Sequence, residues 1–465
     1  MSARRPLRLV FICVLALSLL TGCVTSLAPA RPLVGTGTAN ERAVAVAVQA
    51  NGIKHYVWSE CDGGSCQIVY QRIKFGAPIY QYVLSAAPGV AIINPDVAVT
   101  ADGRAFVTRS VCAEGVCTDE YSIFPADAND TTMIVWQPLA EPAANSGGPP
   151  KLKARDNIVY AVYLVTTSGP HRLRYRQLSG GTSGGYVDLR ADMRPAAPSL
   201  AIGSDGVVHV TWAARKIGAS EIAYGNNNGT SGDFSTVFSY DNAGDYNFRG
   251  SDIALDPDNT PYIVYAFDDG ANDVVRIRCE AAITDCFGEI GTRTIPLNAA
   301  QNPWRLRGSP HIQLLSWSPA VVFAADNSAT DNNEIWFYTP PSSGIDPGPT
   351  RATNNAVQDD EPQIVVERSN FGDVPVVAWR TYERVTFSGI DLDCSRDAYM
   401  FYFDTTTVRR VFTSTGGCFN VGQELAANGQ WVAGVWLDYY SSGISRVVPW
   451  TSLNANTRYM PITAK

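Results

Sequence analysis

The chain has 465 residues and a formal net charge of −8; 17% of its residues are charged and 10% are aromatic. This acidic balance argues against a nucleic-acid partner, which would call for a basic patch. Its 39 glycines suit a fold of strands joined by many turns.

The first residues have the features of an export signal. Arg4, Arg5 and Arg8 precede an apolar stretch at 9–20. That stretch is too short to span a bilayer as a stable helix, so it is expected to be removed after export. No other apolar run in the chain reaches the length of a membrane span.

The sequence Leu-Thr-Gly-Cys at 20–23 resembles the lipobox of bacterial lipoproteins. In that family the chain is cut before the cysteine, which then carries lipid. The resemblance implies a signal peptide at 1–22, a lipidated Cys23 with a short linker at 23–40, and anchorage to a bacterial membrane on its extracytoplasmic side. Each buried methylene would contribute about 0.8 kcal/mol. An ordinary secretory signal with an incidental cysteine is the alternative.

Eight of the ten cysteines remain once Cys13 leaves with the signal and Cys23 takes lipid. An even number in an exported chain favours disulfides. Metal binding is the alternative, but no pair has the two-residue spacing of zinc ligands. The expected disulfides join near neighbours: Cys61 with Cys66, Cys112 with Cys117, Cys279 with Cys286, and Cys394 with Cys418.

One phrase recurs eight times between Ala43 and the C-terminus. It consists of an apolar run, a turn built on Gly, Asn or Asp, a second run that usually ends in an aromatic residue, and a third run; weaker fourth runs close most copies. Only Arg109 replaces the aromatic end. The second runs are KHYVW at 54–58, AFVTR at 105–109, VYAVY at 159–163, VHVTW at 208–212, PYIVY at 261–265, PAVVF at 319–323, PVVAW at 375–379 and VAGVW at 432–436.

A repeat of about 48 to 60 residues with four runs predicts a blade of four antiparallel strands. Each blade is apolar on both faces, so blades must pack face to face around an axis. The sequence therefore predicts an all-β protein in which residues 41–465 form a single β-propeller. Eight blades are favoured and seven are the alternative. The aromatic residues that end the second runs are expected to pack between blades.

The turns after several first runs resemble the Asp-box of sialidase-like propellers. They include QANG at 49–52, TADG at 100–103, SDG at 204–206 and LDPDN at 255–259. The full Asp-box spacing is not reproduced. The Asp side chain accepts backbone hydrogen bonds and Gly supplies a positive φ, so the resemblance informs the fold rather than any chemistry.

The loops after the second runs and between copies should gather on one face and mix arginines, carboxylates and aromatics. These loops supply the ligand-binding candidates: Arg215, Arg249, Asp268, Trp304, Arg305, Arg380, Tyr382 and Tyr439. A non-catalytic protein that binds a glycan or protein partner through this face is favoured, because every catalytic signature is incomplete. No catalytic residue is assigned.

The alternative is a glycan-active enzyme, either a sialidase-like exo-glycosidase or a propeller polysaccharide lyase. The four arginines could clamp a carboxylate, with Asp268 as acid and Tyr382 or Tyr439 as nucleophile. However, the Arg-Ile-Pro signature of sialidases is missing. His55 and His209 occupy the same place in two copies and are expected to be packing residues, whereas His311 opens a first run from which it could reach the axis.

No metal or other cofactor is expected, apart from a calcium ion that the Asp-rich loops at 268–273 and 326–334 leave open. The chain is expected to act as a monomer. Its partners are expected to be a membrane, through the N-terminal lipid, and a glycan or protein ligand.

Overall fold

The computed structural model describes residues 40–451. The backbone gaps within that range are 63–64, 130–131, 142–144, 167–170, 180–181, 191–193, 217–218, 228–234, 243–247, 269–272, 280–290, 298–304, 317, 327–332, 342–345, 355–357, 370–371, 388–389, 403–406, 414–422 and 440–444. The side chains at 40–43, 61–65, 179–184, 190–197, 215–220, 228–249, 369–371, 382–423 and 436–451 also lie outside the description.

The described residues form eight antiparallel sheets, each built from one continuous segment of the chain. We number them as blades. Blade 1 holds β1 (Asn40–Val48), β2 (Lys54–Asp62), β3 (Ser65–Lys74) and β4 (Ala77–Ser85); blade 2 holds β5 (Ala91–Val99), β6 (Ala105–Ala113), β7 (Val116–Phe124) and β8 (Trp136–Pro138). Blade 3 holds β10 (Lys151–Arg155), β11 (Ile158–Thr166), β12 (Arg172–Ser179) and β13 (Thr182–Arg190), with β9 (Asn145–Ser146) paired to β11; blade 4 holds β14 (Arg194–Ile202), β15 (Val208–Lys216), β16 (Ala219–Asn226) and β17 (Ser235–Asn242).

The second half of the chain repeats this order. Blade 5 holds β18 (Phe248–Leu255), β19 (Pro261–Asp268), β20 (Asp273–Cys279) and β21 (Thr292–Thr294); blade 6 holds β22 (Arg305–Leu315), β23 (Ser318–Asp326), β24 (Glu334–Tyr338) and β25 (Thr350–Arg351). Blade 7 holds β26 (Gln358–Ser369), β27 (Gly372–Phe387), β28 (Ile390–Tyr402) and β29 (Thr407–Thr413); blade 8 holds β30 (Gln423–Asn428), β31 (Trp431–Tyr439) and β32 (Ser445–Thr451).

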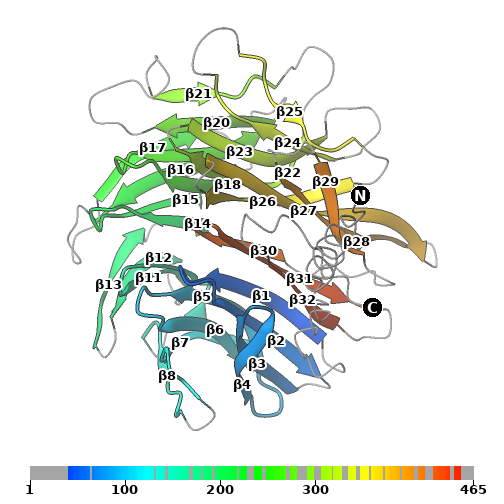
Figure 1. Ribbon diagram of the computed structural model, residues 1–465. Coiled ribbons are helices and arrows are strands. Elements are labelled where there is room, and N and C mark those ends of the chain that lie inside the picture. The colour runs from blue at the N-terminus through cyan, green and yellow to red at the C-terminus, as the bar shows by residue number, and fades with distance from the viewer. Residues whose placement is uncertain are drawn as a thin grey trace, which may run out of the picture.

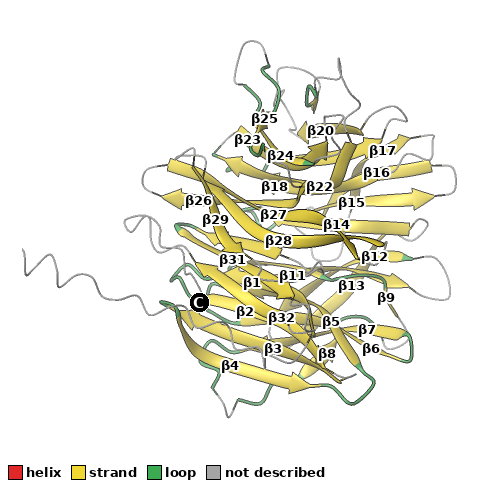
Figure 2. Ribbon diagram, turned by 90° about the vertical axis from the view of Figure 1, so that its right-hand side faces the viewer, coloured by secondary structure: helices red, strands yellow, loops and turns green. Residues whose placement is uncertain are grey.

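The first strands of the blades form a closed ring. Each of them contacts the first strand of the next blade, from β1 and β5 round to β26 and β30, and β30 contacts β1 again. Figure 1 shows β1 beside β30 and β31, and Figure 2 shows β1 beside β31 from the side. Among the described strands no ladder joins β1 to blade 8, so there the ring closes by packing and not by a shared sheet. The predicted eight-bladed propeller is confirmed.

The second strands carry the core because their residues are apolar on both faces. Six of the seven aromatic residues that end them are buried as expected: Trp58, Tyr163, Trp212, Tyr265, Phe323 and Trp379 are at most 1% exposed. The side chain of Trp436 lies outside the described residues. Arg109, the exception, pairs with Glu120 and lies 4.0 Å from the ring centre of Trp136. It therefore fills the aromatic position with its own planar group, stacked on an aromatic from β8.

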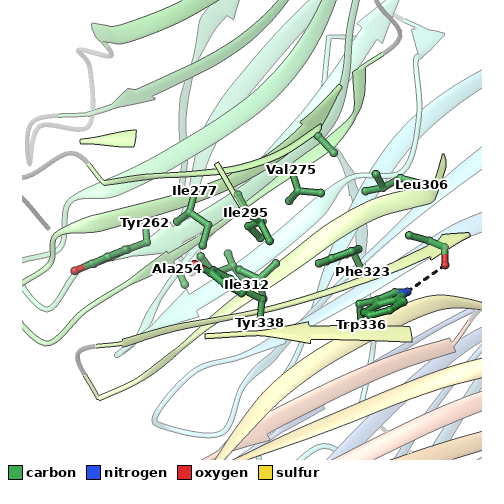
Figure 3. Close-up of a cluster of buried hydrophobic side chains, with 14 of the residues drawn as sticks. Ala254, Tyr262, Val275, Ile277, Ile295, Leu306, Ile312, Phe323, Trp336 and Tyr338 are labelled. Carbon is green, nitrogen blue, oxygen red and sulfur yellow. Dashed lines mark hydrogen bonds between the residues drawn. The ribbon is translucent and has the colours of Figure 1, made fainter. Parts of the chain in front are cut away.

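The clusters between blades are continuous apolar layers. The cluster between blades 5 and 6 brings Tyr262, Val275 and Ile277 against Phe323 and Trp336, as Figure 3 shows. Trp336 donates its indole N–H to the carbonyl of Ala325 at 3.2 Å, so this large side chain is buried without an unpaired donor. Such layers cover both faces of a blade, which a single sheet could not do.

The turns between first and second strands are structural, as the Asp-box resemblance implied. Gly52, Gly103 and Gly206 have φ of 79°, 90° and 81°. Asp256 Oδ1 accepts the N–H of Asp258 at 2.9 Å and of Thr260 at 2.8 Å, which fixes the turn after β18. These turns hold the end of the propeller opposite the loop face.

One predicted disulfide is confirmed: Cys112 is bonded to Cys117. Cys66 and Cys279 are disulfide-bonded as well. The side chains of Cys61, Cys286, Cys394 and Cys418 lie outside the described residues, and so does Cys23.

His55 and His209 are packing residues, as expected. Each is buried, with Nδ1 2.6 Å from the hydroxyl of a tyrosine on the third strand, Tyr70 or Tyr224. Burial lowers the pKa of His55 to about 3, with a further contribution from Arg72, and lowers the pKa of His209 to about 4. Both imidazoles are therefore neutral at pH 7, as a buried ring should be.

Candidate functional site

Eight residues occupy one equivalent position on the innermost strands. Each is the register partner of the fourth residue of a second run, such as Thr108 in blade 2 or Val264 in blade 5. We call this set the axial ring. Its members are Ala45, Asp96, Lys151, Ser199, Asp252, His311, Gln363 and Glu424.

The backbone just before the axial ring is also shared. In five blades a proline precedes the ring residue: Pro95, Pro150, Pro198, Pro310 and Pro362. In blades 2, 4, 6 and 7 the register also shifts immediately before the ring. Proline lacks the N–H that a central strand needs, and bulges re-aim side chains, so both are typical of an edge strand. The innermost strands thus bend at one common level.

Side chains of the axial ring join neighbouring blades. Asp96 Oδ2 accepts the N–H of Leu152 at 2.8 Å, and Gln363 Oε1 accepts that of Leu425 at 2.8 Å. Glu424 accepts the N–H of Val46 across the junction where the chain closes on itself. In each case the donor follows the ring position of the next blade, and that residue is apolar and buried. These bonds satisfy backbone groups that an edge strand would otherwise leave unpaired.

Asp252 connects three blades through its side chain. Its Oδ1 accepts the hydroxyl of Ser199 at 2.5 Å and the N–H of Ile253 at 2.9 Å. Its Oδ2 accepts the N–H of Ile312 at 3.1 Å and lies 3.3 Å from Nδ1 of His311. Burial alone would raise its pKa, but His311 and these donors lower it, so Asp252 is ionised at neutral pH.

His311 differs from the two buried histidines because its side chain is 36% exposed. If Nδ1–H points to Asp252, Nε2 is left as an acceptor at the axis, and this tautomer is the one that a neighbouring carboxylate favours. A carboxylate-oriented imidazole that solvent can reach is the arrangement of a general base.

The opposite side of the ring holds two carboxyl groups with raised pKa values. Burial and the charge of Asp96 raise the pKa of Glu424 to about 8, against the effect of Lys151 and Lys153. Burial also raises the pKa of Asp96. Blade 1 lies between these two residues and contributes only Ala45 to the ring, so no larger side chain separates them there. Two carboxyls that repel each other titrate as a pair.

The loop-face candidates occupy different environments. Asp268 ends β19 and is half-buried, and Arg305 begins β22 and is exposed. Arg380 is buried in β27, with its side chain 3% exposed, and forms an ion pair with Glu361. Arg215, Arg249, Tyr382 and Tyr439 lie on β15, β18, β27 and β31, but their side chains are outside the description, as is the whole of Trp304.

One hairpin breaks the repeat at the loop face. β27 continues past its aromatic residue Trp379 to Phe387, whereas β2 ends at Asp62, soon after Trp58. β28 pairs with β27 along this extension, ending with Phe387 opposite Ile390. The hairpin extends beyond the neighbouring blades in Figure 1. Tyr382 is part of it, opposite Ser395.

Within the described residues, no cluster of three or more His, Cys, Asp or Glu side chains could hold a metal ion. Most of the Asp-rich loops at 268–273 and 326–334 fall outside those residues, so calcium binding by these loops stays a prediction from the sequence. No helix in the described part of the chain is long and apolar enough to cross a membrane.

No protein-family model matches the chain, and no curated protein matches it. Solved structures do match. Oligopeptidase B from Trypanosoma brucei is 11% identical with a TM-score of 0.48, and the match covers 88% of this chain and 54% of that one. Polysaccharide lyase Uly1 is 8% identical with a TM-score of 0.43, covering 74% and 87%. The six-bladed lectin of Aleuria aurantia, described with a fucose recognition mode, is 11% identical with a TM-score of 0.34, covering 68% and 94%.

These neighbours include a glycan-active enzyme and a lectin, but the activities in their names belong to those proteins. The axial ring itself was missed in the sequence, although a signal was present. A proline, a polar residue and an apolar residue follow one another in NPDV, APSL, SPHI and EPQI. Only the register between strands shows that these polar residues are equivalent.

Proposed function

We propose that this chain is an exported β-propeller, anchored to a bacterial membrane through lipid on Cys23, that binds a glycan or protein partner through its loop face without turnover. The extended hairpin of β27 and β28 carries the proposal. With 16 residues β27 is the longest of the described strands, and its extension lies at the face where the loops between blades also lie. Loops positioned on a rigid scaffold are the usual place for binding.

The environment of Arg380 supports binding over sialidase-like hydrolysis. A carboxylate clamp needs guanidinium groups that a substrate can reach. Arg380 is instead buried and paired with Glu361. Arg305 is exposed, but it comes from the neighbouring blade and its register partner is Asp326.

Export is supported by the disulfide between Cys112 and Cys117, since such bonds persist in oxidising compartments. The anchor and its extracytoplasmic position rest on the N-terminal residues. Replacing Cys23 with Ala is expected to release the protein from membranes into the soluble fraction. Continued sedimentation with membranes would contradict lipid anchorage.

A glycan-active enzyme is the second candidate, and the pair of His311 and Asp252 favours it. An imidazole held by a carboxylate could accept a proton from a bound substrate. The same pair is also part of the bonding between blades 5 and 6, which is why binding comes first.

The test uses the soluble fragment from Val24 onward on a glycan array and against fluorogenic glycosides, including a sialoside. A second protein carries a short Gly-Ser turn in place of residues 382–395, and a control carries Gly-Ser in place of Phe75 and Gly76 in the turn of blade 1. We expect glycan binding that the hairpin replacement weakens at least tenfold, with no glycoside turnover. Turnover that His311→Asn abolishes would establish the enzyme instead. Binding that ignores the hairpin would move the site away from it.

A further inference from the structure

Blade 3 places two lysines on the axis of the propeller. Lys151 and Lys153 lie two residues apart on the innermost strand β10, so both point to the same side of it. Both are exposed, while Leu152 between them is buried. Since an innermost strand is surrounded by blades, exposure there means that solvent reaches the axis. Lys151 begins β10 and therefore lies toward the loop end of the axis.

The level of Lys153 is lined mainly by small side chains. The residues two positions after the axial ring in the other blades are Ala47, Ala98, Ala201, Ala254, Gln313, Val365 and Ala426. Five of these seven are alanines, so the side chains opposite Lys153 are short. Apart from Lys153, none of these residues is charged.

Neither ammonium group has a hydrogen bond or an ion pair with a described residue. The nearby carboxyls are already engaged: Asp252 takes four donors and Asp96 accepts from Val97 and Leu152. Desolvation of the ammonium group between the blades would lower the pKa of Lys151, but the charges of Asp96, Glu424 and Asp252 raise it, so Lys151 is protonated. The axis thus offers two charged donors that the fold itself does not use.

We propose that Lys151 and Lys153 form an anion subsite at the propeller axis that takes the carboxylate of an acidic saccharide. The proposal rests on the proposed function in its glycan form and names the class of glycan. Ser199, His311 and Gln363 surround the same level with hydroxyl, imidazole and amide groups, which suit the hydroxyls of a sugar ring.

Binding at this subsite is coupled to the charge of Glu424. The charged groups that face Lys151 across the ring are Asp96 on β5, Asp252 on β18 and Glu424 on β30, with His311 on β22 as a further titratable group. Below its pKa of about 8 Glu424 is neutral and can donate a hydrogen bond; above that pKa its negative charge repels the anion. Affinity for an acidic saccharide should fall as the pH rises from 6 to 9.

The experiment measures binding of the soluble fragment from Val24 to a tetragalacturonate, to its methyl ester, to neutral saccharides of equal length and to inorganic phosphate by calorimetry. Lys151→Met and Lys153→Met are compared with Lys74→Met, an exposed lysine at the end of β3. We expect the acid to bind at least tenfold more tightly than its ester, each axial variant to lose about tenfold or more, and Lys74→Met to bind as the parent does. Glu424→Gln should remove most of the pH dependence while the protein stays folded by circular dichroism.

The outcomes separate the two proposals. Equal binding of acid and ester, or binding that both axial variants retain, overturns the anion subsite and leaves loop-face binding standing. Phosphate binding as tight as that of the acid would show an anion site without saccharide specificity, and overturns it as well. If the parent protein binds no acidic saccharide on the array or in the calorimeter, the subsite proposal fails whatever protein partner the hairpin has.

Discussion

The second strands and the axial ring are the two most regular parts of this molecule, but they are regular in different ways. The second strands repeat their residue type, as Trp58, Trp212 and Trp379 show at one equivalent position. The axial ring repeats only its position and carries Lys151, Ser199 and His311 in different blades. Packing between blades requires large aromatic side chains, whereas the axis accepts any side chain whose polar groups find hydrogen-bond partners. The difference separates what holds the fold from what can carry specificity.

The largest expected effect comes from the packing position. Trp212→Ala removes a fully buried indole and should lower the free energy of unfolding by about 3–5 kcal/mol, from lost burial and the cavity left behind. Urea denaturation measures the loss. Arg109→Ala, at the same position in blade 2, is the matched control. It should lower the free energy of unfolding by less, because Arg109 is a charged side chain that packs on Trp136 of β8. Equal losses would erase the distinction between the aromatic ends and their exception.

A smaller loss is expected at the ring. Asp252→Ala leaves the N–H of Ile312 and the hydroxyl of Ser199 without their acceptor, which should cost about 1–3 kcal/mol. Asp252→Asn retains an oxygen and should cost less. Urea denaturation of both variants measures the difference. If Asp252→Ala left the free energy of unfolding unchanged, these hydrogen bonds would contribute nothing to holding the blades together.

The third prediction concerns pH. Glu424 has a folded-state pKa of about 8, above its ordinary value of 4.5, so the folded protein holds this proton more tightly than the unfolded chain does. Its contribution to stability is complete below pH 4.5 and is lost as the pH rises toward 8. Glu424→Gln should therefore flatten the decline in melting temperature between pH 5 and pH 8.5. Asp96→Asn should do so more weakly, because Asp96 keeps two backbone donors that favour its charge. An unchanged pH profile in Glu424→Gln would contradict the coupling.

The smallest change in stability is expected at a position where different blades already carry different residue types. His209→Phe introduces the residue that blade 2 has at this place, Phe106, and should change stability by less than about 1 kcal/mol at pH 7. The hydroxyl of Tyr224 would still accept a hydrogen bond from the side-chain amide of Asn226, at 3.3 Å. Because burial lowers the pKa of His209 to about 4, the native protein should lose stability as the pH falls below 6.5, and the variant should lose less. Thermal unfolding between pH 4 and pH 7 measures both.

The fold was predictable because it depends on a pattern that each blade repeats. Second runs such as VHVTW and turns such as SDG identify the inner pair of strands, and the blade count follows from counting them. The axial ring was not predictable, since Asp96 and Lys151 become neighbours only through register and ring closure. The position of His311 at the start of a first run indicates that it could reach the axis, but nothing local indicates that Asp252, in the preceding blade, contacts it.

The loop-face residues show a second limit of sequence reasoning. Arg380 and Arg305 are both arginines that the sequence assigned to the loop face, yet one is buried against Glu361 and the other is exposed. Whether a side chain near a loop is buried depends on which neighbouring residues pack against it. The extended pairing of β27 and β28 was also missed, although apolar and polar residues alternate on both sides of the Ser-Gly pair at 388–389.

The closure of the ring has a consequence for how the chain could be cut. Since every blade comes from one continuous segment and β1 shares no ladder with blade 8, the junction between the two is chemically of the same kind as the other seven. A chain joined end to end and opened instead at Gly89, in the exposed turn between blades 1 and 2, would sever no sheet. The order of blades along the gene is in this sense arbitrary, and only their order around the axis is fixed by the structure.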